Sequence, residues 1–195
     1  MHWLKVWKIP ELARTSQGRF IENLVALREE AAEGGRVKER IVAIIPVRAF
    51  DDRFLVTISR NGQIKKTPLA EYGRPRGGGI IGVGLKDGDH LVRAILTDGK
   101  RDLLVSTSQG QTIRFSAEDV RPMGRAATGV IAVKFKEKKP GDHVVDMAEA
   151  DDTAQLLSVC ANGYGVRAAM GDYPVKGRGG QGVMSVSGLE RNGEV

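Results

Sequence analysis

The sequence predicts an all-β fold built from a repeated four-stranded unit, and three observations predict it. The chain has 25 glycines among 195 residues but only 5% aromatic residues, and the glycines recur beside short β-branched runs. An apolar strand, a glycine turn and a basic strand occur three times, with Gly62, Gly110 and Gly163 at the turns. Four strands in each repeat of about fifty residues indicate a propeller-like array.

Each repeat opens with a hairpin. The first strands begin at Phe54, Leu103 and Leu156, and every second strand carries a cation four residues after its glycine. Asn61-Gly62 and Asn162-Gly163 can adopt the positive φ of a tight turn, because glycine lacks a Cβ that would clash there. These segments therefore predict hairpins.

A glycine-rich, basic loop follows each hairpin, and two further strands complete the repeat. We expect the third strand of each repeat at 79–83, 129–133 and 182–186. A Gly-Asp turn then introduces a fourth strand in two of the repeats, at 88–92 and 141–145. The same order of segments in each copy predicts four-stranded blades.

The first fifty residues are predicted to form a copy without its opening, with strands at 3–7, 20–24 and 41–45 and a helix-compatible insertion at 28–36. The last residues, 190–195, reach a turn where earlier copies begin another strand. We therefore expect one domain over 1–195, with repeats at approximately 1–50, 51–98, 99–150 and 151–195. The terminal blades are expected to be incomplete, as in a fragment of a longer protein.

Composition excludes several classes of protein. The one cysteine, Cys160, allows no internal disulfide, and three scattered histidines predict no zinc site or other cofactor. Neither a signal peptide nor an apolar run of about eighteen residues is present, so we expect no membrane partner. A cytoplasmic protein is predicted.

The formal charge of +6 and the sequence pI of about 9.6 fit an anionic partner, and the positive charge recurs at one blade position. Around a disc, this recurrence would give a basic perimeter that follows phosphates. A general solubilising role explains any single cation equally well. It would not require cations to recur at the same blade position in successive repeats. The predicted phosphate contacts are Lys5, Lys65, Lys66, Arg74, Arg76, Arg114, Arg121, Arg125, Arg167, Lys176 and Arg178.

The motifs do not predict catalysis. The glycines of 177–182 match G-x-G-x-x-G, but a strand is expected to follow them rather than the helix that a dinucleotide site needs. No Gly-Lys-Ser/Thr closes a P-loop, and His90 and His143 occupy equivalent places after a turn. Cys160, Tyr72 and Tyr173 are interpreted as packing residues, and we expect no catalytic site.

Several stretches together resemble the C-terminal domain of the bacterial DNA gyrase A protein, and equally that of its topoisomerase IV paralogue. They are Trp3 to Pro10, Gly62 to Leu69, Ile113 to Phe115, Asp119 to Arg125 and Asn162 to Gly165. The resemblance implies a β-pinwheel whose blades exchange strands and whose basic edge bends DNA. In gyrase, that wrapping supports supercoiling by a type II topoisomerase whose catalytic tyrosine lies in another domain.

As partners, the resemblance implies duplex DNA, the gyrase A N-terminal cleavage domain and the gyrase B subunit, in the bacterial nucleoid. The family also has a glycine-rich box with two adjacent arginines. Residues 176–182 keep Arg178 and its glycines but have only one arginine. A propeller that serves as a protein-interaction platform is the alternative, and an enzyme with a site in a central channel has only the glycine motifs in its favour.

Overall fold

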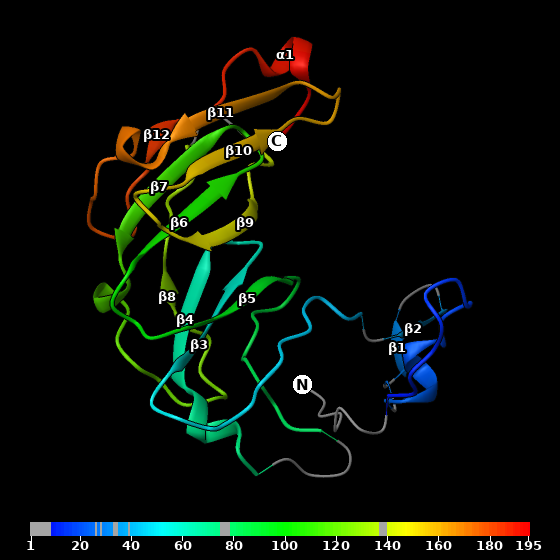
Figure 1. Cartoon of the computed structure of the whole chain (residues 1–195). Coiled ribbons are helices and arrows are strands. Elements are labelled where there is room, and N and C mark those ends of the chain that lie inside the picture. The colour runs from blue at the N-terminus through cyan, green and yellow to red at the C-terminus, as the bar shows by residue number, and fades with distance from the viewer. Residues whose placement is uncertain are drawn as a thin grey trace.

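A computed structural model describes residues 9–25, 27, 29–32, 35–38, 40–74, 79–136 and 140–195. Its main body is a stack of three antiparallel sheets, and the residues before it lie to one side (Figure 1). Short 3-10 turns join the strands, and the one α-helix in the described ranges is α1 (Leu189–Asn192). The predicted all-β fold is confirmed.

The first sheet has four strands, and one of them comes from the following repeat. The strands, from edge to edge, are β5 (Leu91–Thr97), β3 (Phe54–Ser59), β4 (Gln63–Pro68) and β8 (Val130–Ile131). β3 and β4 form the predicted hairpin around Gly62, whose φ is 79°. β8 pairs with β4 through Gln63 and Ile64, so the repeat at 99–150 completes the sheet of the repeat at 51–98.

The second sheet repeats this arrangement. Its strands, in order, are β9 (Val144–Glu149), β6 (Asp102–Thr107), β7 (Gln111–Ser116) and β12 (Val183–Met184). β12 belongs to the repeat at 151–195 and pairs with β7 through Thr112 and Gln111. The strand exchange between neighbouring repeats therefore occurs twice.

The third sheet is the hairpin of β10 (Gln155–Val159) and β11 (Gly165–Ala169). The turn between them contains Gly163, with a φ of 84°. Among the described residues no further strand pairs with either edge. This sheet therefore has half the strands of the other two.

The main core lies between the first and second sheets. β3, β6 and β7 contribute fully buried side chains such as Val56, Val105 and Phe115, and Met147 of β9 joins them. Because neighbours cover both faces of these strands, their burial is nearly continuous and does not alternate. Tyr72 and Tyr173 are buried as predicted, each in a smaller apolar cluster, and Cys160 is also buried.

Each exchanged strand is preceded by a glycine with positive φ, Gly129 before β8 and Gly182 before β12. A Cβ at Gly129 would overlap the Ile64 carbonyl oxygen, and one at Gly182 would overlap the Thr112 carbonyl oxygen. Only glycine allows the connection to approach the neighbouring sheet so closely. The glycine-rich loops thus allow strand exchange.

Several predicted strands are wrong, and most of them lie towards the N-terminus. Residues 79–83 form no strand, and 41–45 form none either. In the later repeats, the segments equivalent to 79–83 are β8 and β12, which pair with β4 and β7. The segments equivalent to 41–45 contain β5 and β9, which pair with β3 and β6. The described residues supply no hairpin beside 41–45 or 79–83.

Two other predictions near the N-terminus are corrected. Residues 20–24 contain a 3-10 turn, η2 (Ile21–Asn23), and not a strand. In place of the predicted helix-compatible insertion at 28–36, the described residues form two paired antiparallel strands, β1 (Glu29–Ala32) and β2 (Gly35–Lys38). The predicted strand at 3–7 lies outside the described residues, and the assignment of residues 1–50 to an incomplete blade stays a prediction.

Candidate nucleic-acid interface

Three cations occupy equivalent positions in the second strands of the hairpins. Lys66 lies in β4, Arg114 in β7 and Arg167 in β11. Lys66 and Arg114 are 5% and 9% exposed, whereas Arg167 is exposed. The same sequence position is therefore buried in the two four-stranded sheets and open to solvent in the third.

The two buried cations make the same contact with the next repeat. The Lys66 ammonium donates to the Ala117 carbonyl at 2.6 Å, and the Arg114 guanidinium donates to the Met170 carbonyl at 3.2 Å. Ala117 and Met170 begin the 3-10 turns η4 (Ala117–Asp119) and η5 (Met170–Asp172). Each cation thus binds the backbone of the following blade.

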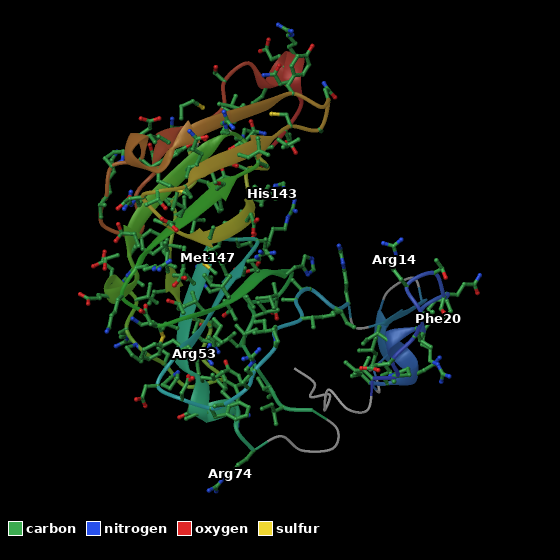
Figure 2. The ribbon with its side chains drawn as sticks, in the orientation of Figure 1. Arg14, Phe20, Arg53, Arg74, His143 and Met147 are labelled. Atoms are coloured by element: carbon green, nitrogen blue, oxygen red, sulfur yellow. The ribbon has the colours of Figure 1, made fainter. Side chains whose placement is uncertain are left out.

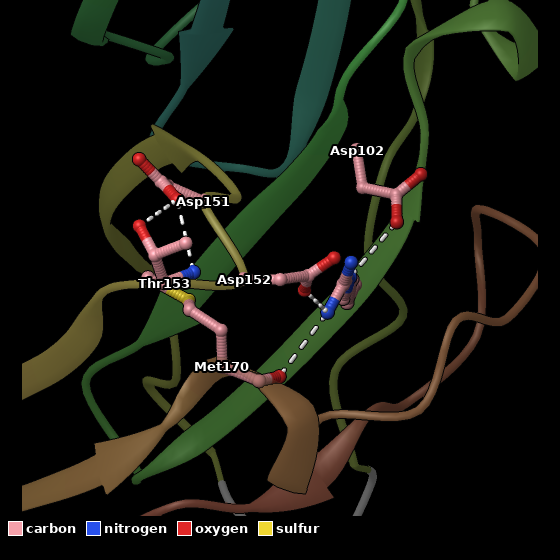
Figure 3. A network of polar contacts seen from close by, with 6 residues as sticks. Asp102, Asp151, Asp152, Thr153 and Met170 are labelled. Atoms are coloured by element: carbon pink, nitrogen blue, oxygen red, sulfur yellow. Dashed lines mark hydrogen bonds and ion pairs between the residues drawn. The ribbon is translucent and has the colours of Figure 1, made fainter.

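Arg114 is the centre of a polar network (Figure 3). Its Nε lies 2.9 Å from a carboxylate oxygen of Asp102, and its Nη1 lies 2.8 Å from one of Asp152. Hydrogen bonds to Asp152 and Asp102 outweigh the effect of burial and raise the pKa of Arg114 further. A shallow hollow of about 350 Å³ lies over these groups and is lined also by Lys100 and Asp151.

Lys65 is more deeply buried than any other predicted contact residue whose exposure is known, at 1% exposed. Its Nζ donates to the carbonyl of Gly82 at 2.8 Å and to that of Arg125. Burial, with the nearby Arg125 charge, lowers the pKa of Lys65 to about 8. The hydroxyl of Tyr72 donates to the same Gly82 carbonyl at 2.9 Å.

These contacts describe the surroundings of three residues of the predicted phosphate-binding set. Lys65, Lys66 and Arg114 direct their charged groups to protein carbonyls and carboxylates, because their strands lie inside completed sheets. The sequence pattern located recurring cations correctly but could not distinguish a cation between blades from one on the rim. We therefore leave these three residues out of the proposed interface.

The other predicted contacts remain accessible where they are described. Arg74, Arg121, Arg167, Lys176 and Arg178 are exposed, and Arg125 is half-buried. Lys5 and Arg76 lie outside the described residues. Arg74 extends away from the sheets at one end of the molecule (Figure 2).

Most of these accessible cations lie in the connections that lead to the exchanged strands. We define the exchange connections as residues 120–129, from η4 to β8, and 173–182, from η5 to β12. Arg121 and Arg125 lie in the first and Lys176 and Arg178 in the second. Arg74 follows the equivalent turn η3 (Leu69–Tyr72).

The backbone holds both exchange connections against the preceding sheet. The N–H of Met123 donates to the Lys66 carbonyl at 2.8 Å, and the N–H of Lys176 donates to the Arg114 carbonyl at 2.8 Å. In Figure 1 the turns η3, η4 and η5, coloured teal, green and orange, follow one another along the left side. The connections therefore place cations in succession along one edge.

Arg178 also ties the second exchange connection to the residues on either side of the first. Its Nε donates to the Asp119 carbonyl at 2.9 Å, and its Nη1 donates to the Ile131 carbonyl at 3.1 Å. Sequence reasoning identified Arg178 only as a phosphate contact and missed this bridging role. The acceptors are backbone carbonyls, which no residue-type pattern reveals.

The other candidate motifs lie at the starts of strands. The glycines of 177–182 lead into strand β12, as predicted, and not into a helix. His90 and His143 precede β5 and β9 at equivalent places, and their carbonyls accept from Arg60 and Ser108. In the described ranges, no three His, Cys, Asp or Glu side chains gather where they could hold a metal ion.

No helix within the described part of the chain has the length and apolar character needed to cross a membrane.

The sheets and their connections define a propeller-like protein whose successive blades exchange strands. The family model for the DNA gyrase C-terminal domain, a β-propeller, matches residues 53–98, 101–150 and 155–195. The chain belongs to this family. The three matched segments correspond to the repeats that contain the three sheets.

Curated relatives agree with the family. The chain is 41% identical over 198 residues to the DNA gyrase A protein of Salmonella typhimurium LT2, covering 100% of this chain and 21% of that protein. It is 39% identical over 194 residues to the DNA gyrase A protein of Mycobacterium tuberculosis H37Rv, covering 98% of this chain and 22% of that protein. The chain therefore spans about a fifth of the length of these relatives.

Solved structures show the same fold. A crystal structure of the C-terminal domain of DNA topoisomerase IV matches 97% of this chain and 56% of that one, with a TM-score of 0.80 and 24% identity. A DNA gyrase A C-terminal domain matches 82% of this chain and 50% of that one, with a TM-score of 0.64 and 24% identity. The sequence-based resemblance to this family is confirmed.

Proposed function

We propose that this chain binds duplex DNA without sequence preference and bends it along the exchange connections. The observation that carries the proposal is that both exchange connections hold accessible cations. Arg121 and Lys176 are exposed, and their connections are hydrogen-bonded to successive sheets. Lysine and arginine neutralise phosphates and release the counterions condensed on DNA, which favours binding to any sequence.

The arrangement of the sheets supports the bending part of the proposal. Each exchange connection crosses from one sheet to the preceding one, so its cations lie along the stack. Phosphates that contact successive connections must follow a curved path, and deforming a short duplex costs on the order of 1–6 kcal/mol. Several phosphate contacts together can offset that cost.

In the whole protein, we propose that this module acts as the C-terminal part of a gyrase A protein, within a type II topoisomerase. The family membership supports that role. The module would hold DNA beside a cleavage domain elsewhere in gyrase A, in a complex with gyrase B in the bacterial nucleoid. This chain itself would supply DNA binding and no catalytic group.

Binding to a fluorescent linear duplex across a salt series tests the proposal directly. The dissociation constant should rise steeply with salt, with a log–log slope of about 0.9 for each neutralised phosphate. Relaxed circles closed by ligase in the presence of the chain report bending or wrapping as a shift in linking number. Salt-sensitive binding without a shift in linking number would show that the chain binds DNA through a basic surface but does not bend or wrap it.

A matched pair of double variants locates the interface. Arg121→Gln with Lys176→Gln removes one exposed cation from each exchange connection and should lower the salt slope by about 2. Lys86→Gln with Lys100→Gln makes the same charge change at exposed positions outside the connections and should leave the slope unchanged. Equal losses in both variants would show that only net charge matters.

Absence of binding at low salt would overturn the proposal. The accessible cations would then be better explained by an acidic protein partner, as in a propeller that serves as a protein-interaction platform. Circular dichroism of each variant separates a lost contact from a lost fold.

A further inference from the structure

Two arginines occupy equivalent places in the two exchange connections. Arg125 comes four residues before Gly129, and Arg178 comes four residues before Gly182. Both glycines have positive φ, and each leads directly into an exchanged strand. The chain therefore approaches the neighbouring sheet in the same way after each arginine.

The backbone after each arginine also makes the same contact with the repeat before it. The N–H of Gly84 donates to the Ala127 carbonyl at 3.1 Å, and the N–H of Lys134 donates to the Gly180 carbonyl at 2.8 Å. Ala127 and Gly180 each lie two residues after the arginine of their connection. Position 125 in the first connection and position 178 in the second are therefore structurally equivalent.

A buried lysine holds the first connection from the inside. The Lys65 ammonium donates to the carbonyl of Arg125, and the same nitrogen donates to the Gly82 carbonyl at 2.8 Å. In the second repeat of this pattern, the residue equivalent to Lys65 is Ile113, whose Cδ1 lies 3.5 Å from the place of a Cβ on Gly180. Isoleucine has no group that can donate, so it cannot supply the same tie to the second connection.

Arg178 supplies a tie to the second connection from the outside. Its side chain is exposed, yet its Nε donates to the Asp119 carbonyl at 2.9 Å and its Nη1 donates to the Ile131 carbonyl at 3.1 Å. Asp119 ends the turn before the first connection, and Ile131 lies in the strand after it. One side chain thus fixes the second connection to both ends of the first.

We propose that Arg178 is a positioning residue, which fixes the distance between the cations of the two exchange connections and so sets the curve of the bound duplex. This inference rests on the proposed binding and bending of DNA. Two nitrogens of the guanidinium are used on the protein, so the role of Arg178 is mainly geometric. Lysine would keep the charge, but its single nitrogen on a flexible stem cannot reproduce one bond from each of two nitrogens in a fixed plane.

A fixed distance between the connections matters because a duplex resists bending. When the cations cannot move, the duplex has to curve in order to bring its phosphates to both connections. When the second connection can shift, the protein can adapt to a straighter duplex instead. Loss of the tie should therefore reduce bending far more than it reduces the electrostatic part of binding.

The substitution Arg178→Lys separates these two effects on DNA. The dissociation constant should rise by less than about threefold, because the charge is kept. The linking-number shift per bound chain, measured at saturation on relaxed circles closed by ligase, should fall to about half or less. Arg48→Lys, the same change at an exposed arginine outside the connections, is the control and should leave this shift unchanged.

The linking-number shift also distinguishes positioning from a contribution to stability. A residue that only stabilised the fold would change the free energy of unfolding but not the shift per bound, folded chain. An equal shift for Arg178→Lys and the wild type would overturn the inference and leave the proposed function intact.

Amide hydrogen exchange tests the positioning without DNA. The amides of Gly179 and Lys134 donate across the contact between the second connection and the preceding repeat. In Arg178→Lys both should exchange about tenfold faster, whereas the amide of Met123 in the first connection should keep its rate. Unchanged rates at Gly179 and Lys134 would overturn the positioning role. A wild-type chain that binds no DNA would instead overturn the proposed function, and the exchange rates would still decide the positioning role.

Discussion

β7 and β11 are equivalent strands of successive repeats, yet they differ in almost every physical property. Ile113 of β7 is 1% exposed, whereas Val166, its equivalent in β11, is 42% exposed. β7 is covered by β12 and by the turn of the next repeat, and in the described residues β11 is paired only with β10. The comparison shows that the burial of a strand in this fold depends on what the next repeat supplies.

The largest difference is expected at the glycines of the two hairpin turns. Gly110 and Gly163 both have positive φ, so alanine at either costs about 1 kcal/mol in backbone strain. A Cβ at Gly110 would also overlap the Val186 carbonyl oxygen, whereas nothing lies within 4 Å of one at Gly163. Gly110→Ala should lower the free energy of unfolding by about 3 kcal/mol or more, and Gly163→Ala by about 1.

Urea denaturation followed by circular dichroism measures both glycine variants. A similar loss of unfolding free energy in the two variants would mean that the segment after β12 does not restrict the space at the Gly110 turn.

The next largest difference in stability is expected between variants of the equivalent residues Arg114 and Arg167. Arg114→Met leaves Asp102 and the Met170 carbonyl without their donor and should destabilise by about 2–4 kcal/mol. Arg167→Met removes an exposed side chain and should change stability by less than about 0.5 kcal/mol. Thermal and urea unfolding of the two variants measure this difference. A large loss of stability in Arg167→Met would contradict the exposure of Arg167 on β11.

A smaller, pH-dependent effect is expected at Lys65, whose equivalent in β7 is the apolar Ile113. Because its pKa in the folded state is about 8, below the ordinary 10.5, the unfolded chain holds more protons between these values. Stability should therefore rise with pH across this window, by about 1–2 kcal/mol from this group.

Lys65→Met removes this titration, and methionine suits the buried site. The difference in unfolding free energy between wild type and Lys65→Met, measured at pH 7.5 and at pH 10, should shift in favour of the wild type at the higher pH. A difference that does not change with pH would show that the Lys65 ammonium is as well solvated as in the unfolded chain.

The hairpins were predictable because their information is local. Asn-Gly at the turns and β-branched runs beside them specify β3–β4 and β10–β11 within about fifteen residues. Segments 79–83 and 41–45 have the same local character but form no strand, because local residue types do not decide which segments join a sheet. The β1–β2 hairpin was missed because its alanines and glutamates favour a helix locally.

The candidate interface was predictable only in part, for a related reason. The spacing of Lys66, Arg114 and Arg167 shows that a cation recurs, but not whether a following blade covers it. Arg121 and Lys176 stay accessible because they lie in connections on the edge of the stack.

The sequence by itself determined the repeat, the hairpin turns, the positions of the cations and the family. Each of these depends on residue types at fixed short spacings, which are present before the chain folds. Only the tertiary structure decided which cations are buried and which strands are shared between repeats. Those outcomes depend on packing between segments about fifty residues apart, where a single carbonyl or a missing neighbour determines the environment of a side chain.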